Sequence, residues 1–148
     1  MPTHYPGTEE ERRALDVFIK LMRATDSVAA RTMRRTQLRG LTPTQFGVLE
    51  ALLHLGPLSP SQLAEKHLMS RNNLSVVVEN LEKAGLVRRE PDEHDRRAYR
   101  VHLTDTGRER IETVLPEHVH AIVEEMRSLT PEEQEQLGAL LRRLGRKE

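Results

Sequence analysis

Three tetrapeptides in this chain carry the same signal for the start of a helix. Residues 42–45 read Thr-Pro-Thr-Gln, residues 59–62 read Ser-Pro-Ser-Gln, and residues 130–133 read Thr-Pro-Glu-Glu. In each, a hydroxyl can cap the first turn, the proline stands where its missing N–H is not needed, and Gln or Glu can return a hydrogen bond to the capping residue. The sequence therefore predicts three helix boundaries independently of one another.

Apolar residues that recur every three or four positions predict further helices. A long amphipathic helix is expected from Glu9 to about Gln37, and a shorter one, capped by Ser70, is expected over residues 71–83. Another helix is expected to begin near residue 104, and Pro116 is expected to bend it. The fold is therefore expected to be mainly α.

The apolar period changes after the helix that Ser70 caps. Residues 86–89 and 98–103 predict two short strands, and the charged segment 90–97 between them predicts a hairpin. The order helix, turn, helix, strand, hairpin, strand is that of a winged helix-turn-helix, in which the second helix enters the major groove of DNA. We therefore expect a small β-wing on a helical lobe over residues 42–104.

Composition excludes several classes of protein. The 148 residues suit a single domain, and they include no cysteine, which excludes disulfides, cysteine nucleophiles and cysteine-ligated zinc. Without a signal peptide or a membrane-length apolar run, a cytoplasmic protein with no membrane partner is expected. No nucleophile–base grouping, phosphate loop or metal spacing is present, so we expect neither an enzyme nor a cofactor. Basic and acidic residues balance at 23 each, so any case for DNA binding depends on where they lie.

The helix predicted to enter the major groove is rich in groups that read base edges. Asn pairs with adenine, Arg pairs with guanine, Ser accepts either, and a helix N-terminus favours a phosphate. The candidate DNA contacts on this helix are Ser70, Arg71, Asn72, Asn73, Ser75 and Asn80. The alternative interpretation is that these side chains only cap and solvate the helix.

The predicted hairpin holds a second group of candidates. On a tight turn, the carboxylate of Asp95 can hold a neighbouring guanidinium in a fixed pose, and an arginine presented in this way suits a narrow, electronegative minor groove. The candidates are Asp95, Arg96 and Arg97 on the hairpin and Arg89 on the strand before it. Because Asp92 and Glu93 also lie on the hairpin, a surface ion pair without a partner is the alternative.

Several stretches of the chain match the patterns of one family. The matching stretches are 41–46, 58–64, Leu81–Arg89, Asp95–Ala98 and Val101–Gly107. The last three follow the patterns L-x-x-x-G-L-V, D-x-R-[RA] and V-x-L-T-x-x-G, and through them the chain resembles the MarR family of bacterial transcriptional regulators. The resemblance covers about residues 10–146.

The resemblance implies a homodimer that binds a palindromic DNA site. Residues 10–37 and 105–146 would form the dimerisation platform, and the lobe over 42–104 would bind the DNA. The residues agree with this, because the long apolar helices at the two ends cannot all be covered by a small winged lobe. A two-fold dimer would place its half-sites about one helical turn, ~34 Å, apart.

The resemblance also assigns roles to single residues. Asp95 takes the role of a buttress on the wing, and Arg97 takes that of a minor-groove finger. Ser59 and Ser61 become candidate phosphate contacts. Glu90 departs from the family, in which many members carry a basic residue, and is expected to weaken contact with the DNA backbone on that strand.

A small effector is implied as well, since members of the family commonly bind aromatic acids or phenolic, lipophilic compounds between the platform and the lobe. The candidate lining residues are Phe18, Met22, Phe46, His54, Val114 and His118. Ordinary core or interface positions are the alternative interpretation of these residues. We expect no metal site, because His118 and His120 are two residues apart and do not share a helical face.

The sequence therefore predicts a sequence-specific DNA-binding regulator, a repressor that is released by a small aromatic or lipophilic effector. The alternatives are an effector-independent architectural DNA-binding protein and a winged helix that binds another protein. The basic and amide side chains of residues 71, 72, 96 and 97 argue against the last alternative, because a surface that had lost DNA binding would not need them.

Overall fold

The computed structural model describes residues 4–146, which fall into two compact units. The winged unit is Gln37–Glu117, and the terminal-helix unit consists of the described residues up to Thr36 and from His118 onward. Within the described residues, no helix combines the length and the apolar character that crossing a membrane requires.

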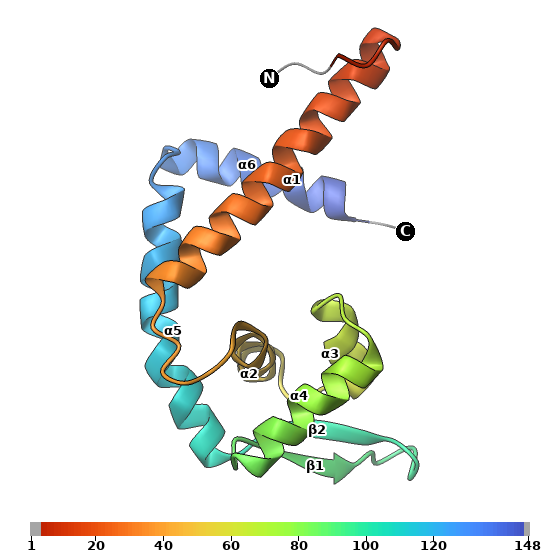
Figure 1. The fold of residues 1–148 in the computed structure, drawn as a ribbon, viewed down its shortest axis with the longest axis vertical. Helices are drawn as coiled ribbons and strands as arrows, with labels where there is room; N and C mark the ends of the chain where they lie inside the picture. The colour runs from red at the N-terminus through yellow and green to blue at the C-terminus, as the bar shows by residue number, and fades with distance from the viewer. Residues whose placement is uncertain (1–3, 147–148) are drawn as a thin grey trace. The chain divides into compact units, whose positions relative to one another are not determined.

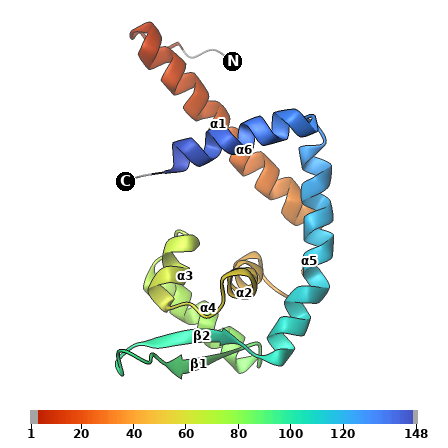
Figure 2. The ribbon, with the colours of Figure 1, turned by 180° about the vertical axis from the view of Figure 1, so that it is seen from behind.

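The winged unit contains three helices, a hairpin and the first part of a fourth helix (Figure 1). In chain order these are α2 (Pro43–Leu55), α3 (Pro60–Lys66), α4 (Arg71–Lys83), β1 (Val87–Pro91), β2 (Tyr99–Leu103) and α5 (Asp105–Met126). The hairpin tip projects from the helices of this unit (Figure 2). The mainly α fold with a small β-wing is thus confirmed.

The sheet is antiparallel and slightly longer than the sequence predicts. Val87 lies opposite Leu103, and Pro91 lies opposite Tyr99, so that β1 continues two residues beyond the predicted end at Arg89. Proline is tolerated there because it stands at the end of an edge strand, where no donor is needed. Leu58 adds a short third segment, exchanging two backbone hydrogen bonds with Val101 at N–O distances of 3.3 and 2.8 Å.

All three predicted capping boxes are formed. At α2, Thr42 Oγ1 accepts the backbone N–H of Gln45 at 3.1 Å, and Gln45 Oε1 accepts that of Thr42 at 3.0 Å. Ser59 and Thr130 make the same pair of bonds at the starts of α3 and α6 (Pro131–Gly145). Because capping joins residues three apart, these boundaries could be read from the sequence alone.

The core of the winged unit draws on every helix and on the sheet. Its largest fully buried side chains are Val48, Leu49, Leu63, Leu74, Val78, Leu81, Val101, Ile111 and Val114. Three of them lie on α4 at helical spacing, so one face of α4 is held against the core and the opposite face is left outward. The core thereby fixes which residues of α4 a partner can reach.

A close backbone contact joins the start of α5 to the end of α4. Thr104 Oγ1 donates a hydrogen bond to the carbonyl of Gly85 at 2.6 Å and accepts the N–H of Gly107 at 3.0 Å. A Cβ added at Gly107 would stand 1.9 Å from the carbonyl oxygen of Leu86. Only glycine fits at residue 107, because any side chain would push the two backbone segments apart.

The terminal-helix unit contains α1 (Glu9–Arg35), the later part of α5, and α6. Helix α1 ends two residues before the predicted limit at Gln37. Glu125 on α5 is nearly buried and receives Arg31 and Arg35 of α1, with N–O distances of 2.8 and 3.3 Å. The division between the units falls within α5, directly after Pro116 and Glu117.

Candidate nucleic-acid interface

The outward face of α4 presents polar side chains that have no partner among the residues that the structure describes. Within residues 4–146, the structure gives neither a hydrogen bond nor an ion pair to five side chains, and all five are exposed. These are Arg71, Asn72, Asn73, Ser75 and Asn80. Their donors and acceptors are therefore available to an external partner, as readout of base edges requires.

Three serines lie at helix starts. Ser70 caps α4 by accepting the N–H of Asn73 at 3.1 Å, and Ser59 caps α3 by accepting that of Gln62 at 3.2 Å. Each hydroxyl still has its own hydrogen to donate, which a phosphate oxygen can accept. Ser61 is exposed in the first turn of α3.

The exposed face of α4 also holds residues that the sequence analysis did not single out. Val76 is largely exposed, and Glu79 forms an ion pair with Lys83 at 3.3 Å. The helical period could have found them, because residues 76, 79 and 83 lie opposite the buried stripe at about 100° per residue.

The turn of the wing is built on backbone hydrogen bonds to two aspartates. Asp95 Oδ1 accepts the backbone N–H of Arg97 at 3.0 Å, and Asp92 Oδ1 accepts that of His94 at 2.8 Å. The sequence suggests that Asp95 holds a guanidinium, whereas the structure shows its carboxylate on the main chain, as is common when Asp begins a turn. Asp95 thus shapes the loop that carries Arg97.

Two arginines at the wing tip are left with free guanidinium groups. Arg96 and Arg97 are both exposed, and within residues 4–146 the structure gives neither of them an ion pair. Arg89 differs, because it forms an ion pair with Glu82 at 3.4 Å and lies over the ring of Tyr99, 5.1 Å from its centroid. The free positive charge of the wing is therefore concentrated at its tip.

The sheet of the wing carries its own charge network. Glu90 accepts Arg88 Nε at 2.7 Å and lies 3.2 Å from His102 Nε2. The hydrogen bond from Arg88 lowers the pKa of the Glu90 carboxyl, and the hydrogen bond from the backbone of His94 lowers the pKa of Asp92. Because Glu90 interacts with Arg88 and His102 on the sheet, it forms no ion pair with the arginines of the wing tip within the described residues.

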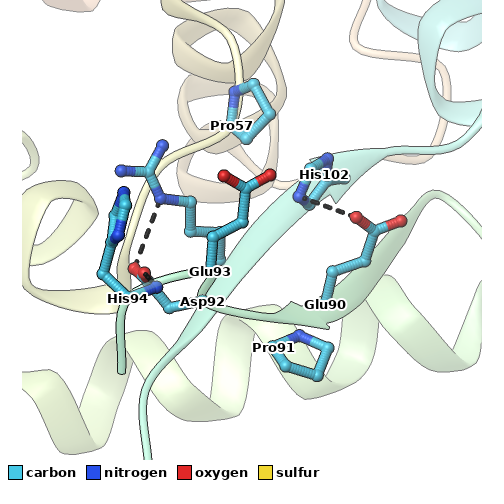
Figure 3. Close-up of a pocket in the computed structure, with 8 residues that line it drawn as sticks. Pro57, Glu90, Pro91, Asp92, Glu93, His94 and His102 are labelled. Atoms are coloured by element: carbon cyan, nitrogen blue, oxygen red, sulfur yellow. Dashed lines mark hydrogen bonds and ion pairs between the residues drawn. The ribbon is translucent and has the colours of Figure 1, made fainter. Parts of the chain in front are cut away.

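A polar cavity of about 360 Å³ lies on one side of the wing (Figure 3). Its lining residues are Pro57, Glu90, Pro91, Asp92, Glu93, His94, Arg100 and His102. None of the candidate effector residues lines it. Although acids and histidines gather there, no group of three or more His, Asp or Glu in the described part of the chain is placed to hold a metal ion.

The candidate effector residues are not gathered within either unit. Phe46 and Val114 are core residues of the winged unit, which agrees with the alternative interpretation of these two positions, whereas His54 is exposed on α2. Phe18 and Met22 are exposed on α1. In the same unit, His118 Nδ1 lies 3.4 Å from Thr36 Oγ1.

Comparisons with known proteins agree with this geometry. A family model described as the MarR family matches residues 39–98. The HTH-type transcriptional regulator YkoM of Bacillus subtilis is 36% identical over 93% of this chain and 89% of its own length. The HTH-type transcriptional regulator MhqR of the same organism is 32% identical over 90% of this chain and 92% of its own length.

A solved structure extends the agreement to the fold. BpsR of Bordetella bronchiseptica, whose DNA binding is regulated by 6-hydroxynicotinic acid, is 27% identical, with a TM-score of 0.76 over 88% of this chain and 99% of that one. Three findings lead to the same assignment: the winged order of elements, the wing arginines without a partner among the described residues, and the relatives that match over nearly their whole length. The chain belongs to the MarR family of DNA-binding winged helix-turn-helix transcriptional regulators.

Proposed function

We propose that this regulator is a cytoplasmic homodimeric repressor that binds a palindromic operator and is released by a small aromatic or lipophilic effector. The proposal rests on one observation, that two exposed polar surfaces belong to the same unit. The outward face of α4 holds amide and guanidinium groups without a partner in the described part of the chain, and the wing tip holds Arg96 and Arg97. A helix and a hairpin equipped in this way suit the major groove and the adjacent minor groove.

In this proposal each group has a distinct task. Asn72, Asn73 and Arg71 read base edges from α4, with Ser75 and Asn80 beside them. Ser59, Ser61 and Ser70 donate to phosphates, which sets the register of the lobe on the duplex without reading sequence. Arg97 enters the minor groove, where its charge meets the negative potential of a narrow A·T tract.

The terminal-helix unit supports the dimer. Its three helices expose large apolar side chains, and such side chains mark an interaction surface where they form a patch. They are Val17, Phe18, Met22, Val119, Val123, Leu137, Leu140, Leu141 and Leu144. Part of this set, Val17, Phe18 and Leu144, lines an apolar groove of about 610 Å³ between α1 and α6, which a two-fold partner would fill with the same elements.

The effector is supported by BpsR, whose DNA binding 6-hydroxynicotinic acid regulates. An effector can release DNA only if it binds the DNA-free conformation more tightly than the DNA-bound one. Of the candidates, Phe18, Met22, His54 and His118 retain exposed surface that a ligand could contact directly.

The test is binding to the DNA upstream of the protein's own gene, compared with random DNA of equal length across a salt series. Selective binding that survives moderate salt supports a sequence-specific regulator and provides the assay in which aromatic acids are screened for release. Equal, salt-sensitive binding to both DNAs would instead favour an architectural DNA-binding protein or an operator that lies elsewhere in the genome. If neither DNA binds even at low salt, the proposal fails, and a winged unit that binds another protein becomes the favoured alternative.

A further inference from the structure

The outward face of α4 has an apolar side chain at its centre. Val76 is 57% exposed, whereas Leu74, Val78 and Leu81 on the opposite side are fully buried. Asn72 lies one turn before Val76, and Asn80 lies one turn after it. The polar groups that are free to read bases therefore surround an apolar one.

The position of Val76 distinguishes it from the other exposed apolar residues of the winged unit. Within the described residues, the large apolar side chains exposed in this unit are Leu55, Leu68 and Val76. Leu55 ends α2 and Leu68 lies in the turn after α3, so Val76 alone stands in the interior of a helix. Valine is also a weaker helix former than alanine or the long polar residues, so helix stability does not explain it.

The major groove offers one apolar feature, the C5-methyl group of thymine. Asn and Arg discriminate adenine and guanine by hydrogen bonds, and neither recognises that methyl group. A branched aliphatic side chain between two asparagines supplies the missing contact.

We propose that Val76 packs against the C5-methyl group of a thymine in each half-site and is a specificity-determining residue of this regulator. The inference rests on the proposed DNA binding through α4. Glu79 lies one turn after Val76, and its carboxylate forms an ion pair with Lys83. Because Lys83 compensates this negative charge, α4 can approach the duplex at this position. Burial of one methyl group corresponds to about a fourfold change in affinity.

The experiment begins with an operator selected from random DNA by the wild-type protein. Each thymine of one half-site is then replaced by deoxyuridine, which removes the methyl group and keeps every hydrogen-bonding group. Wild-type protein is expected to lose about fourfold in affinity at one thymine. The variant Val76→Ala is expected to bind the thymine and deoxyuridine probes equally, about as weakly as wild type binds the latter.

Two control variants separate this contact from general effects. Leu55→Ala removes an equally exposed apolar side chain, 55% exposed, and should keep the full discrimination between the two probes. Asn80→Ala should weaken binding to both probes by the same factor. Alanine favours the helix, so Val76→Ala should also unfold at the wild-type temperature or above.

Two results would overturn the inference while leaving the proposed function intact. One is a Val76→Ala protein that still discriminates thymine from deoxyuridine. The other is a wild-type protein that binds its selected operator selectively and is insensitive to every deoxyuridine replacement. If selection enriches no sequence at all, the proposed function and the inference fail together.

Discussion

The two units of this chain differ in where their apolar side chains go. The winged unit buries leucines, valines and an isoleucine from every helix and from the sheet. Among its described residues, the terminal-helix unit buries only Thr32, Thr36 and Ala121, and α6 has no buried residue. Both units are built from amphipathic helices, so amphipathicity alone does not decide whether the apolar face of a helix is buried within its own chain.

Because of this difference, we expect the two units to be stabilised in different ways. The winged unit closes its own core, so its folding should depend little on protein concentration. The terminal-helix unit leaves its apolar side chains exposed, so its stability should depend on association with a second chain. The predictions below test this division, beginning with the largest expected effect.

The variant Gly107→Ala should strongly destabilise the winged unit. Its Cβ would stand 1.9 Å from the backbone oxygen of Leu86, and overpacking against a backbone that cannot move aside costs about 3 kcal/mol. Urea unfolding measures the loss. The neighbouring exposed residue provides the control, because Thr106→Ala should stay within about 0.5 kcal/mol of wild type. Equal stabilities of the two variants would contradict the close contact.

The variant Leu140→Glu should weaken dimerisation without unfolding the winged unit. Leu140 is 57% exposed on α6, and a charge placed in an apolar interface should raise the dimer dissociation constant about tenfold or more. Sedimentation equilibrium over a range of concentrations measures this constant. Leu55→Glu introduces the same charge at a similarly exposed site of the winged unit and should leave the mass unchanged. If the dimer dissociation constant of Leu140→Glu equals that of wild type, α6 does not belong to the dimer interface.

The variant Arg97→Ala should weaken operator binding and reduce its salt dependence. It removes one free cation from the wing, so the slope of log affinity against log salt should fall by about 1. Fluorescence anisotropy at several salt concentrations gives both quantities. Arg142→Ala removes an exposed cation from the terminal-helix unit and should leave the slope as in wild type. A slope and an affinity unchanged by Arg97→Ala would refute the role of the wing.

The smallest expected effect concerns His67, at the end of α3. Burial lowers its pKa, with Glu50 opposing the shift, and its Nε2 atom is buried with no hydrogen-bond partner among the described residues. The pKa of His67 is lower in the folded protein than in the unfolded chain, so the unfolded chain binds a proton more readily as the pH falls. The free energy of unfolding is therefore larger above the ordinary pKa of 6.5 and decreases as the pH falls below it. Melting temperatures between pH 7 and pH 5 should fall less steeply in His67→Gln than in wild type.

A matched variant isolates this effect from the titration of other groups. His54→Gln changes an exposed histidine on α2 and should keep the wild-type pH dependence of the melting temperature. Identical pH dependence in His67→Gln, His54→Gln and wild type would show that burial of His67 has no consequence for stability.

The features that could be read from the sequence are those that join residues close in the chain. The helix starts at Thr42, Ser59, Ser70 and Thr130 were all predicted, because a cap and its partner are three residues apart. The winged order of elements followed from the change in apolar period. The resemblance to the MarR family rested on such local patterns as well.

Other features depended on the three-dimensional path of the chain and not on residue type and spacing alone. The extension of β1 to Pro91 depends on pairing with Tyr99, eight positions along the chain. The partner of Asp95 was wrong in the sequence-based interpretation, because the path of the turn decides whether a carboxylate meets a backbone N–H or a guanidinium. The exposure of Val76 was missed because residue type alone does not show which side of α4 the core covers.

The sequence by itself determined the helices, the hairpin and the family of this protein, because capping, periodicity and turn chemistry act over a few residues. Only the tertiary structure decided which faces are left free, because burial is a property of the assembled core. The same amphipathic pattern that seals α4 against the winged unit leaves α6 exposed. The sequence shows that each helix has an apolar face, and the fold decides what covers it.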